Sequence, residues 1–124
     1  MKTFSRNWKS SKKARKQRKY RANLPIHLRS KLTHMHLSEQ LRAAHKTRNM
    51  APRVGDKVKI MRGQFKSREG AIEKVDRAYE RVYVTGMDVI KKDGTKVMFP
   101  FHPSNLMLVE LYLEDKRRIS EAKK

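Results

Sequence analysis

The chain has 124 residues, of which 32 are Lys or Arg and 12 are Asp or Glu, so its formal net charge is +20. A compact protein with this excess charge repels itself, and a polyanionic partner relieves the repulsion. Nucleic acid is the partner that such a charge indicates. An anionic membrane is the alternative, but it requires an amphipathic helix with a broad apolar face, which the sequence lacks.

Other features of the sequence exclude further classes of protein. The chain has no Cys, which rules out a disulfide framework and a thiolate metal site. Its longest apolar run, residues 106–109, is too short to cross a bilayer. The basic N-terminus has no apolar segment behind it, unlike a secretory signal. It imitates an organellar transit peptide, but because the basic character continues past residue 50 we expect a cytoplasmic protein.

Charge divides the chain into two halves. Residues 1–53 carry 16 Lys or Arg and a single acid, for a net charge of +15, whereas residues 54–124 carry a net charge of +5. The second half therefore has the charge balance of an ordinary domain. We predict four parts, which are a basic disordered arm at 1–22, short helices at 23–52, a β domain at 53–113 and a helical tail at 114–124.

The arm is rich in cations and poor in aliphatic side chains. Residues 1–21 hold ten Lys or Arg and no acid. Such a segment buries too little apolar surface to offset its ordering entropy, so we expect it to be disordered when free. Phe4, Trp8 and Tyr20 lie between the cations. Two interpretations remain open, because these rings can stack on unpaired RNA bases, or Trp8 and Tyr20 can pack on the protein body.

Two short helices are predicted after the arm. Pro25 suits a first helical turn, with Leu28 and Leu32 on one face. A second helix should begin after Ser38, a good N-cap residue, with Leu41 pointing inward. Neither helix is long or apolar enough to be stable alone, so both should dock on the domain, on RNA or on both.

From Val54 onward the apolar residues alternate as in β-strands. The inward-facing pairs are Val58 and Ile60; Ile72 and, after a break in phase that indicates a bulge, Val75; Val82 and Val84; Val97 and Phe99; and Leu106 and Leu108. Turn residues separate these runs at 62–64, 93–94 and 100–103. Five short strands with tight turns are typical of a small all-β barrel or a curled sheet.

The first two strands are joined by a basic connection. Residues 53–75 read RVGDKVKIMRGQFKSREGAIEKV, and the connection holds Arg62, Lys66 and Arg68, with Gly63 and Gly70 permitting a tight backbone. A basic hairpin tip of this kind can grip phosphates or enter a nucleic-acid groove. The alternative is a solvated turn with ordinary surface charges.

This hairpin resembles the KOW motif, which ribosomal proteins share with transcription elongation factors and which implies an SH3-like barrel with frequent RNA contact. Further motifs flank it: SKKARKQRK at 11–19, PIHLR at 25–29, LSEQLR at 37–42, RNMAPR at 48–53, DGT at 93–95, HPSN at 102–105 and LEDKRR at 113–118. Together they make the chain similar to the large-subunit ribosomal protein L-twenty-four family in its archaeal and eukaryotic form (L-twenty-six in eukaryotic naming). The resemblance covers essentially the whole chain.

The resemblance implies a structural ribosomal protein that is not an enzyme and needs no cofactor. Family members bind the 5′ region of large-subunit ribosomal RNA, act early in subunit assembly and lie near the peptide exit tunnel. The expected partners are that RNA and neighbouring ribosomal proteins, with no membrane and no small-molecule substrate. The expected RNA-binding residues are the cations of the arm, helices and hairpin and one polar loop: Lys12, Lys13, Arg15, Lys16, Arg18, Lys19, Arg21, Arg29, Arg48, Arg53, Arg62, Lys66, Arg68, His102, Ser104 and Asn105.

The sequence departs from the family pattern at two positions. Ser67 stands where the family often has glycine, so a positive φ there would strain the turn. His45 stands where the family often has tyrosine, which removes a possible stacking contact.

Three other functions fit the sequence less well. A KOW-type transcription or RNA-processing factor usually carries further domains, and a DNA-compacting protein would favour duplex DNA over folded RNA. A small nuclease needs an acid–base pair, an activated nucleophile or a metal. His34 and His36 are spaced so that both could face one way on an extended segment, but no Cys and no nearby acid provides a third metal ligand. Asp56, Glu69 and Asp88 lie on or beside turns, where structural or solubility roles explain them.

Overall fold

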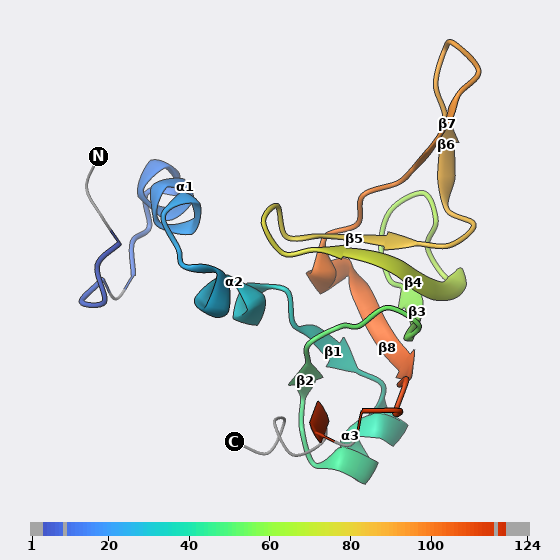
Figure 1. Ribbon diagram of the computed structural model, residues 1–124, viewed down its shortest axis with the longest axis horizontal. Helices are drawn as coiled ribbons and strands as arrows, with labels where there is room; N and C mark the ends of the chain where they lie inside the picture. Colours follow the sequence, from blue (N-terminus) through green and yellow to red (C-terminus); the bar gives the residue numbers. More distant parts are fainter. Residues whose placement is uncertain (1–3, 9, 116, 119–124) are drawn as a thin grey trace.

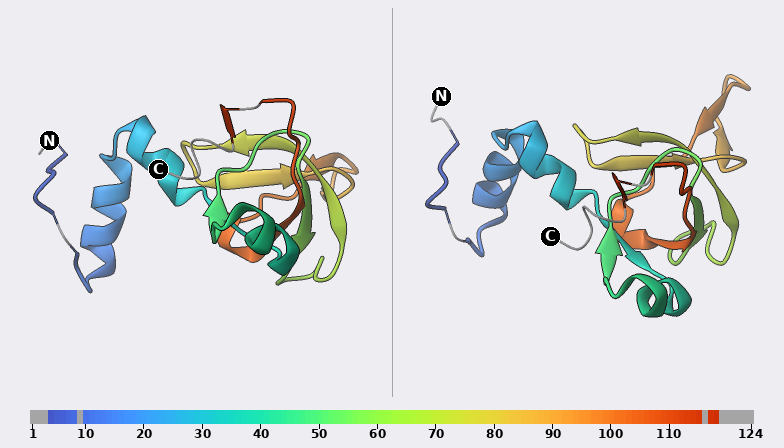
Figure 2. Two further views of the ribbon diagram at one scale, coloured as in Figure 1. Left: turned by 90° about the horizontal axis from the view of Figure 1, so that it is seen from below. Right: turned by 60° about the horizontal axis from the view of Figure 1, so that its bottom comes forward.

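The computed structural model describes residues 4–8, 10–115 and 117–118. The helices are α1 (Ala14–Ala22), α2 (Ile26–Leu32) and α3 (Glu39–His45), with a 3-10 turn η1 (Pro103–Asn105). The strands are β1 (Met35–Leu37), β2 (Asn49–Met50), β3 (Lys57–Ile60), β4 (Glu69–Asp76), β5 (Arg81–Val84), β6 (Asp88–Ile90), β7 (Lys96–Met98) and β8 (Leu106–Glu110). Helices α1 and α2 extend to one side of the β domain, and the β6–β7 hairpin projects from another (Figures 1 and 2).

A mixed sheet forms the domain. Its strand order is β2-β1-β8-β3-β4-β5, with β1 and β8 parallel and the other neighbours antiparallel. Strands β8 and β3 lie at the centre, where Val58 pairs with Leu108 and Ile60 with Leu106. These four side chains are fully buried. The period-two pattern therefore predicts correctly which faces of β3 and β8 form the core.

The sheet is small and curled, and the predicted closed barrel is not confirmed. Strands β2 and β5 are the two edges of the sheet in the described part of the chain. Beyond β5, a single bridge joins Val82 to Phe101. Phe99 and Phe101 lie on the return path, and both belong to the core or pack against it. The chain is therefore a mainly β domain.

The predicted strand around Val97 and Phe99 does not join this sheet. Residues 96–98 form β7, which among the described strands pairs with β6 alone, in a separate two-stranded hairpin with a turn at the predicted Asp93-Gly94. Val97 is 42% exposed, so the expectation that it faces the core is wrong. The alternation of Val97 with Lys96 and Met98 marks a strand, but it does not specify which strand it pairs with.

Local signals predict two helices and one bulge well. Ser38 is the N-cap of α3, where its side chain accepts a hydrogen bond from the backbone N–H of Leu41, and Leu41 packs against the core. Helix α2 follows Pro25 as predicted. The register between β4 and β5 shifts between Ile72 and Lys74, which confirms the predicted break in phase.

Helix α1 lies within the segment expected to be disordered when the protein is free. It spans Ala14–Ala22 and has no buried residue, so the β domain contributes no core packing to it. The expectation for the free protein stays a prediction. Most of the predicted helical tail at 114–124 lies outside the described residues. Of its described residues, 117 and 118 are helical.

Ser67 has the positive φ that the departure from the family pattern at this position made us expect. Its φ is +69°, in the left-handed region that favours glycine. We expect Ser67→Gly to stabilise the domain by roughly 0.5–1 kcal/mol, because relief of left-handed strain exceeds the added entropy of the unfolded chain. Urea unfolding measures this change. Ser30→Gly, inside helix α2, is the control and should destabilise instead, and an equal loss in both variants would contradict the strain argument.

Candidate nucleic-acid interface

The loop between β3 and β4 carries three exposed cations on a hydrogen-bonded backbone. Arg62, Lys66 and Arg68 are exposed. Four backbone hydrogen bonds close the loop, from the N–H groups of Ile60, Lys66, Ser67 and Arg68 to carbonyl oxygens at 2.8–3.1 Å. A fifth ties its first residue to the domain, because the Met61 N–H donates to the Asn105 carbonyl at 2.8 Å. The three cations therefore project from a preorganised scaffold.

Phe65 anchors this loop to the core. Its ring makes edge contacts with Phe99 and Phe101, with centroids 5.4 Å and 5.8 Å away. The Arg68 guanidinium lies 5.5 Å from the centroid of the same ring, a cation–π contact. One aromatic side chain thus fixes both the loop and the direction of one of its cations. We call Arg62, Lys66 and Arg68 the loop triad.

A second basic surface lies between α1 and the β4–β5 turn. A groove of about 650 Å³ is lined there by basic side chains, among them Arg18, Arg21 and Arg81. The half-buried Glu80 lies 3.9 Å from Arg21 and 3.8 Å from His102. We call the residues up to the end of α2, Leu32, the N-terminal extension. The groove joins this extension to the domain and has a large excess of positive charge.

Arg29 has a structural position in this junction. Its guanidinium donates to the carbonyl oxygens of Arg21 and Ala22 at 3.1 Å and of Leu24 at 3.2 Å. These carbonyls belong to the C-terminal end of α1 and the residues after it, which lack helical partners. A fourth bond, 3.1 Å long, reaches the Ala78 carbonyl in the β4–β5 turn. Arg29 therefore holds the extension against the domain, and its expected contact with RNA stays a prediction.

The polar loop motif at 102–105 shapes η1. His102 Nδ1 lies 2.8 Å from the Ser104 hydroxyl and accepts from the Ser104 N–H at 3.3 Å. The Asn105 carbonyl holds the start of the β3–β4 loop, as described above. These contacts give the motif a structural role beside the loop triad, and they leave its expected RNA contact untested.

The other predicted cations lie on or before α1 or near β2. Lys12, Lys13, Arg15, Lys16, Arg18, Lys19 and Arg21 lie on or just before α1, and all are exposed. Arg48 is exposed before β2, whereas Arg53 pairs with Asp115.

Hydrogen bonding from Arg53 lowers the pKa of Asp115. The folded state therefore gains stability from this pair above about pH 4 and loses it as the pH falls further.

Sequence reasoning missed the buried ion pair between Asp56 and Arg118. Arg118 donates to both carboxylate oxygens of Asp56, at 2.6 Å and 2.5 Å. The same carboxylate accepts from the backbone N–H groups of Arg53 and Tyr112, at 2.8 Å and 2.9 Å. Asp56 is fully buried and Arg118 is 3% exposed. This pair fastens the C-terminal segment to the start of β3.

The described residues hold no group of three or more potential metal-ligating side chains. His36 lies in β1, where burial and then the charge of Arg42 lower its pKa. Because the unfolded chain binds this proton more readily, the fold loses stability as the pH falls below about 6.5. No described helix has the length and hydropathy needed to span a membrane.

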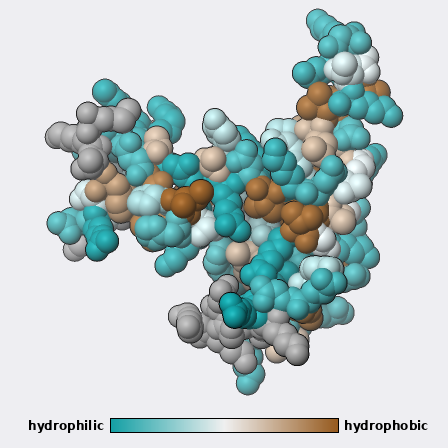
Figure 3. Space-filling model, viewed as in Figure 1, coloured by the Kyte–Doolittle hydropathy of each residue, from teal (hydrophilic) through white to brown (hydrophobic). Residues whose placement is uncertain are grey.

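Most of the visible surface is hydrophilic, and apolar side chains form small separate patches, one of them on the β6–β7 hairpin (Figure 3). The fold and its surface thus define a small β domain with a basic extension and two cationic surfaces. This is the class of small, strongly basic β proteins.

Comparisons with known proteins identify the family. Residues 11–123 match the model of "Ribosomal proteins L26 eukaryotic, L24P archaeal". The large ribosomal subunit protein uL24 of Methanosarcina barkeri is 45% identical over 114 residues, covering 92% of this chain and 98% of that protein. Those of Methanosphaera stadtmanae and Korarchaeum cryptofilum are 45% and 44% identical over 108 residues, covering 87% of this chain and 92% and 82% of theirs.

The chain therefore belongs to this family of ribosomal proteins. It is a structural constituent of the large ribosomal subunit, located in the ribosome in the cytoplasm, and it is not an enzyme.

Proposed function

We propose that the chain binds large-subunit ribosomal RNA through the loop triad and the basic N-terminal extension. The observation that carries this proposal is the loop triad, in which a hydrogen-bonded loop with an aromatic anchor presents three exposed cations. Preorganised donors lose little entropy on binding, so they suit a folded polyanion with fixed phosphate positions.

The family resemblance supports a more specific place for this RNA contact. We infer that the chain binds near the 5′ region of the RNA, supports early subunit assembly, contacts neighbouring ribosomal proteins and lies near the polypeptide exit tunnel. We also infer that the curled sheet is a partly open version of the SH3-like barrel that the KOW motif implies.

Sedimentation tests the ribosomal role against that of a soluble regulatory factor or a DNA-compacting protein, because a ribosomal protein stays with large subunits in washing salt.

Phosphate-dominated binding predicts a steep dependence on salt. If the extension and the loop neutralise about eight phosphates, the log–log slope of affinity against salt should be about −6 to −7. A filter-binding titration with a large-subunit RNA fragment measures this slope. A slope near −1 would show that phosphate contacts do not dominate.

A further inference from the structure

Three aromatic side chains form a cluster on the N-terminal extension. The rings of Trp8 and Tyr20 are stacked, with centroids 4.1 Å apart and planes inclined by 17°. Phe4 lies against Tyr20, with a centroid distance of 5.5 Å. All three rings are half-buried, and none is part of the hydrophobic core. They pack on one another and on α1, so the domain core does not account for them.

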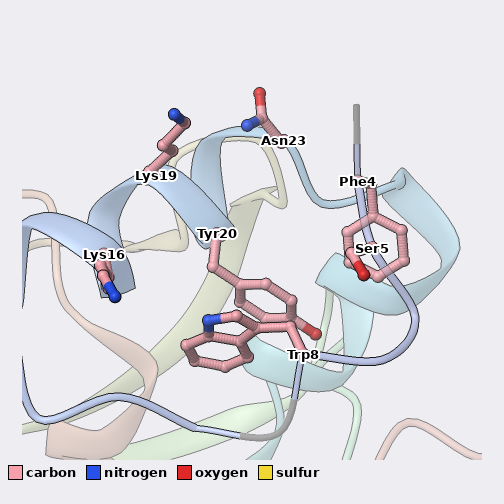
Figure 4. Close-up of a pocket in the computed structure, with 7 residues that line it drawn as sticks. All are labelled: Phe4, Ser5, Trp8, Lys16, Lys19, Tyr20 and Asn23. Carbon is pink, nitrogen blue, oxygen red and sulfur yellow. The ribbon is translucent and has the colours of Figure 1, made fainter. Parts of the chain in front are cut away.

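A pocket of about 400 Å³ opens beside these rings (Figure 4). Besides the three aromatic residues, its lining includes Lys16 and Lys19. Lys16, Lys19 and Tyr20 come from one face of α1, because their spacing of three and four residues matches the helical repeat. We call these five side chains, Phe4, Trp8, Lys16, Lys19 and Tyr20, the aromatic pocket. Its volume lies in the range of small-molecule sites.

The charge around the pocket selects the kind of ligand. The sequence has no acid before Glu39, so no nearby side chain of the extension offsets Lys16 and Lys19. Aromatic rings alone would also suit a cation, but the lysines repel one. An apolar peptide would have to desolvate both ammonium groups. A flat ring that carries its own negative charge satisfies both features, and an unpaired nucleotide is such a ligand.

We propose that the aromatic pocket binds one unpaired RNA nucleotide, with its base against the aromatic rings and its phosphate held by Lys16 and Lys19. This inference rests on the proposed RNA-binding function and names the RNA element that the extension recognises. Every base has a π face, so the pocket recognises an unpaired nucleotide without reading its sequence. The pocket thereby distinguishes loops and bulges from continuous duplex.

Trp8 provides the measurement, because it is the only tryptophan of the chain. The full-length protein is titrated with a five-nucleotide single-stranded RNA and with an abasic ribose-phosphate oligomer of equal length and charge. We expect the RNA to quench Trp8 fluorescence strongly at saturation and the abasic oligomer to quench it little. We also expect the abasic oligomer to bind roughly 5- to 150-fold more weakly, the range that stacking of one base provides.

Variants locate the effect in the pocket. Tyr20→Leu should remove most of the preference for RNA over the abasic oligomer, and Tyr20→Phe should keep it. Tyr112→Leu is the matched control, since Tyr112 is a partly exposed tyrosine after β8 that lines neither the aromatic pocket nor the basic groove. The double variant Lys16→Gln with Lys19→Gln should weaken the binding of both oligomers. The control is Lys91→Gln with Lys92→Gln in the β6–β7 connection, which should weaken their binding less.

Equal quenching and equal affinity for the two oligomers would overturn the proposal, as would a preference that Tyr20→Leu leaves unchanged. A large-subunit RNA fragment is titrated in parallel. If that fragment binds tightly while the base preference is absent, the pocket assignment alone is wrong. If that fragment binds no better than an unrelated polyanion, the proposed RNA-binding function itself is wrong.

Discussion

Replacing Asp56 by Ala should cost about 3–5 kcal/mol of folding free energy, the range for breaking a buried ion pair from one side. The variant leaves the Arg118 guanidinium buried without its carboxylate partner, and it leaves two backbone N–H groups without their acceptor. The total stability of a small domain is roughly 5–15 kcal/mol, so this loss is a large part of it. Urea unfolding followed by circular dichroism measures the change.

The protein contains a matched control for this prediction. Asp115 also pairs with an arginine, Arg53, but on the surface. Asp115→Ala should therefore change stability far less, because water and salt screen an exposed pair. The double variant Asp56→Ala with Arg118→Ala removes both charges and should lose less than the two single losses combined. Similar losses for Asp56→Ala and Asp115→Ala would contradict the structural role assigned to the buried pair.

Changing the loop triad to Ala should weaken binding to cognate ribosomal RNA by several kcal/mol, at ~1–3 kcal/mol for each specific contact. The reason is geometric, because the loop backbone and the Phe65 anchor fix the backbone positions from which the three cations project, and Phe65 also contacts Arg68. Filter binding at one fixed salt concentration measures the loss.

The β6–β7 hairpin provides the control for charge alone. Changing Lys91, Lys92 and Lys96 to Ala removes the same formal charge from another exposed hairpin. That variant should weaken binding by a smaller factor. The turn of this hairpin is also closed by hydrogen bonds, but residues 88–98 contain no aromatic side chain that could anchor it as Phe65 anchors the triad loop. Equal losses in the two triple variants would mean that total charge, and not loop geometry, determines affinity.

Features encoded by neighbouring residues could be predicted from the sequence. Residues a few positions apart encode three such features: the N-cap at Ser38, the bulge between Ile72 and Val75, and the inward faces of β3 and β8. The left-handed conformation of Ser67 depends on one backbone position, so a local departure from the family pattern indicates it. The basic connection at 62–68 is visible in the sequence because its charges lie close together there.

Features that depend on distant partners were missed. Strand β1 has only three residues, and it is a strand because it pairs with β8, about 70 residues later in the chain. Asp56 looks like an ordinary turn residue, and no neighbouring residue indicates that it forms a buried ion pair with Arg118. The alternation around Val97 predicts a strand but does not show that β7 leaves the main sheet. Pairing and burial of this kind are set by tertiary contacts, which override local patterns.

The central claim is that the loop triad provides specificity while the extension provides affinity that discriminates little between RNAs. The measurement is the ratio of affinities for cognate ribosomal RNA and for an unrelated folded RNA of equal length with similar loops, at one fixed salt concentration. Deletion of residues 1–21 should weaken both by similar factors and preserve the ratio, because flexible charge and base stacking read no sequence. Changing Arg62, Lys66 and Arg68 to Ala should lower the ratio sharply. If the deletion collapses the ratio while the triple Ala variant preserves it, specificity lies in the extension and the role assigned to the loop triad is wrong.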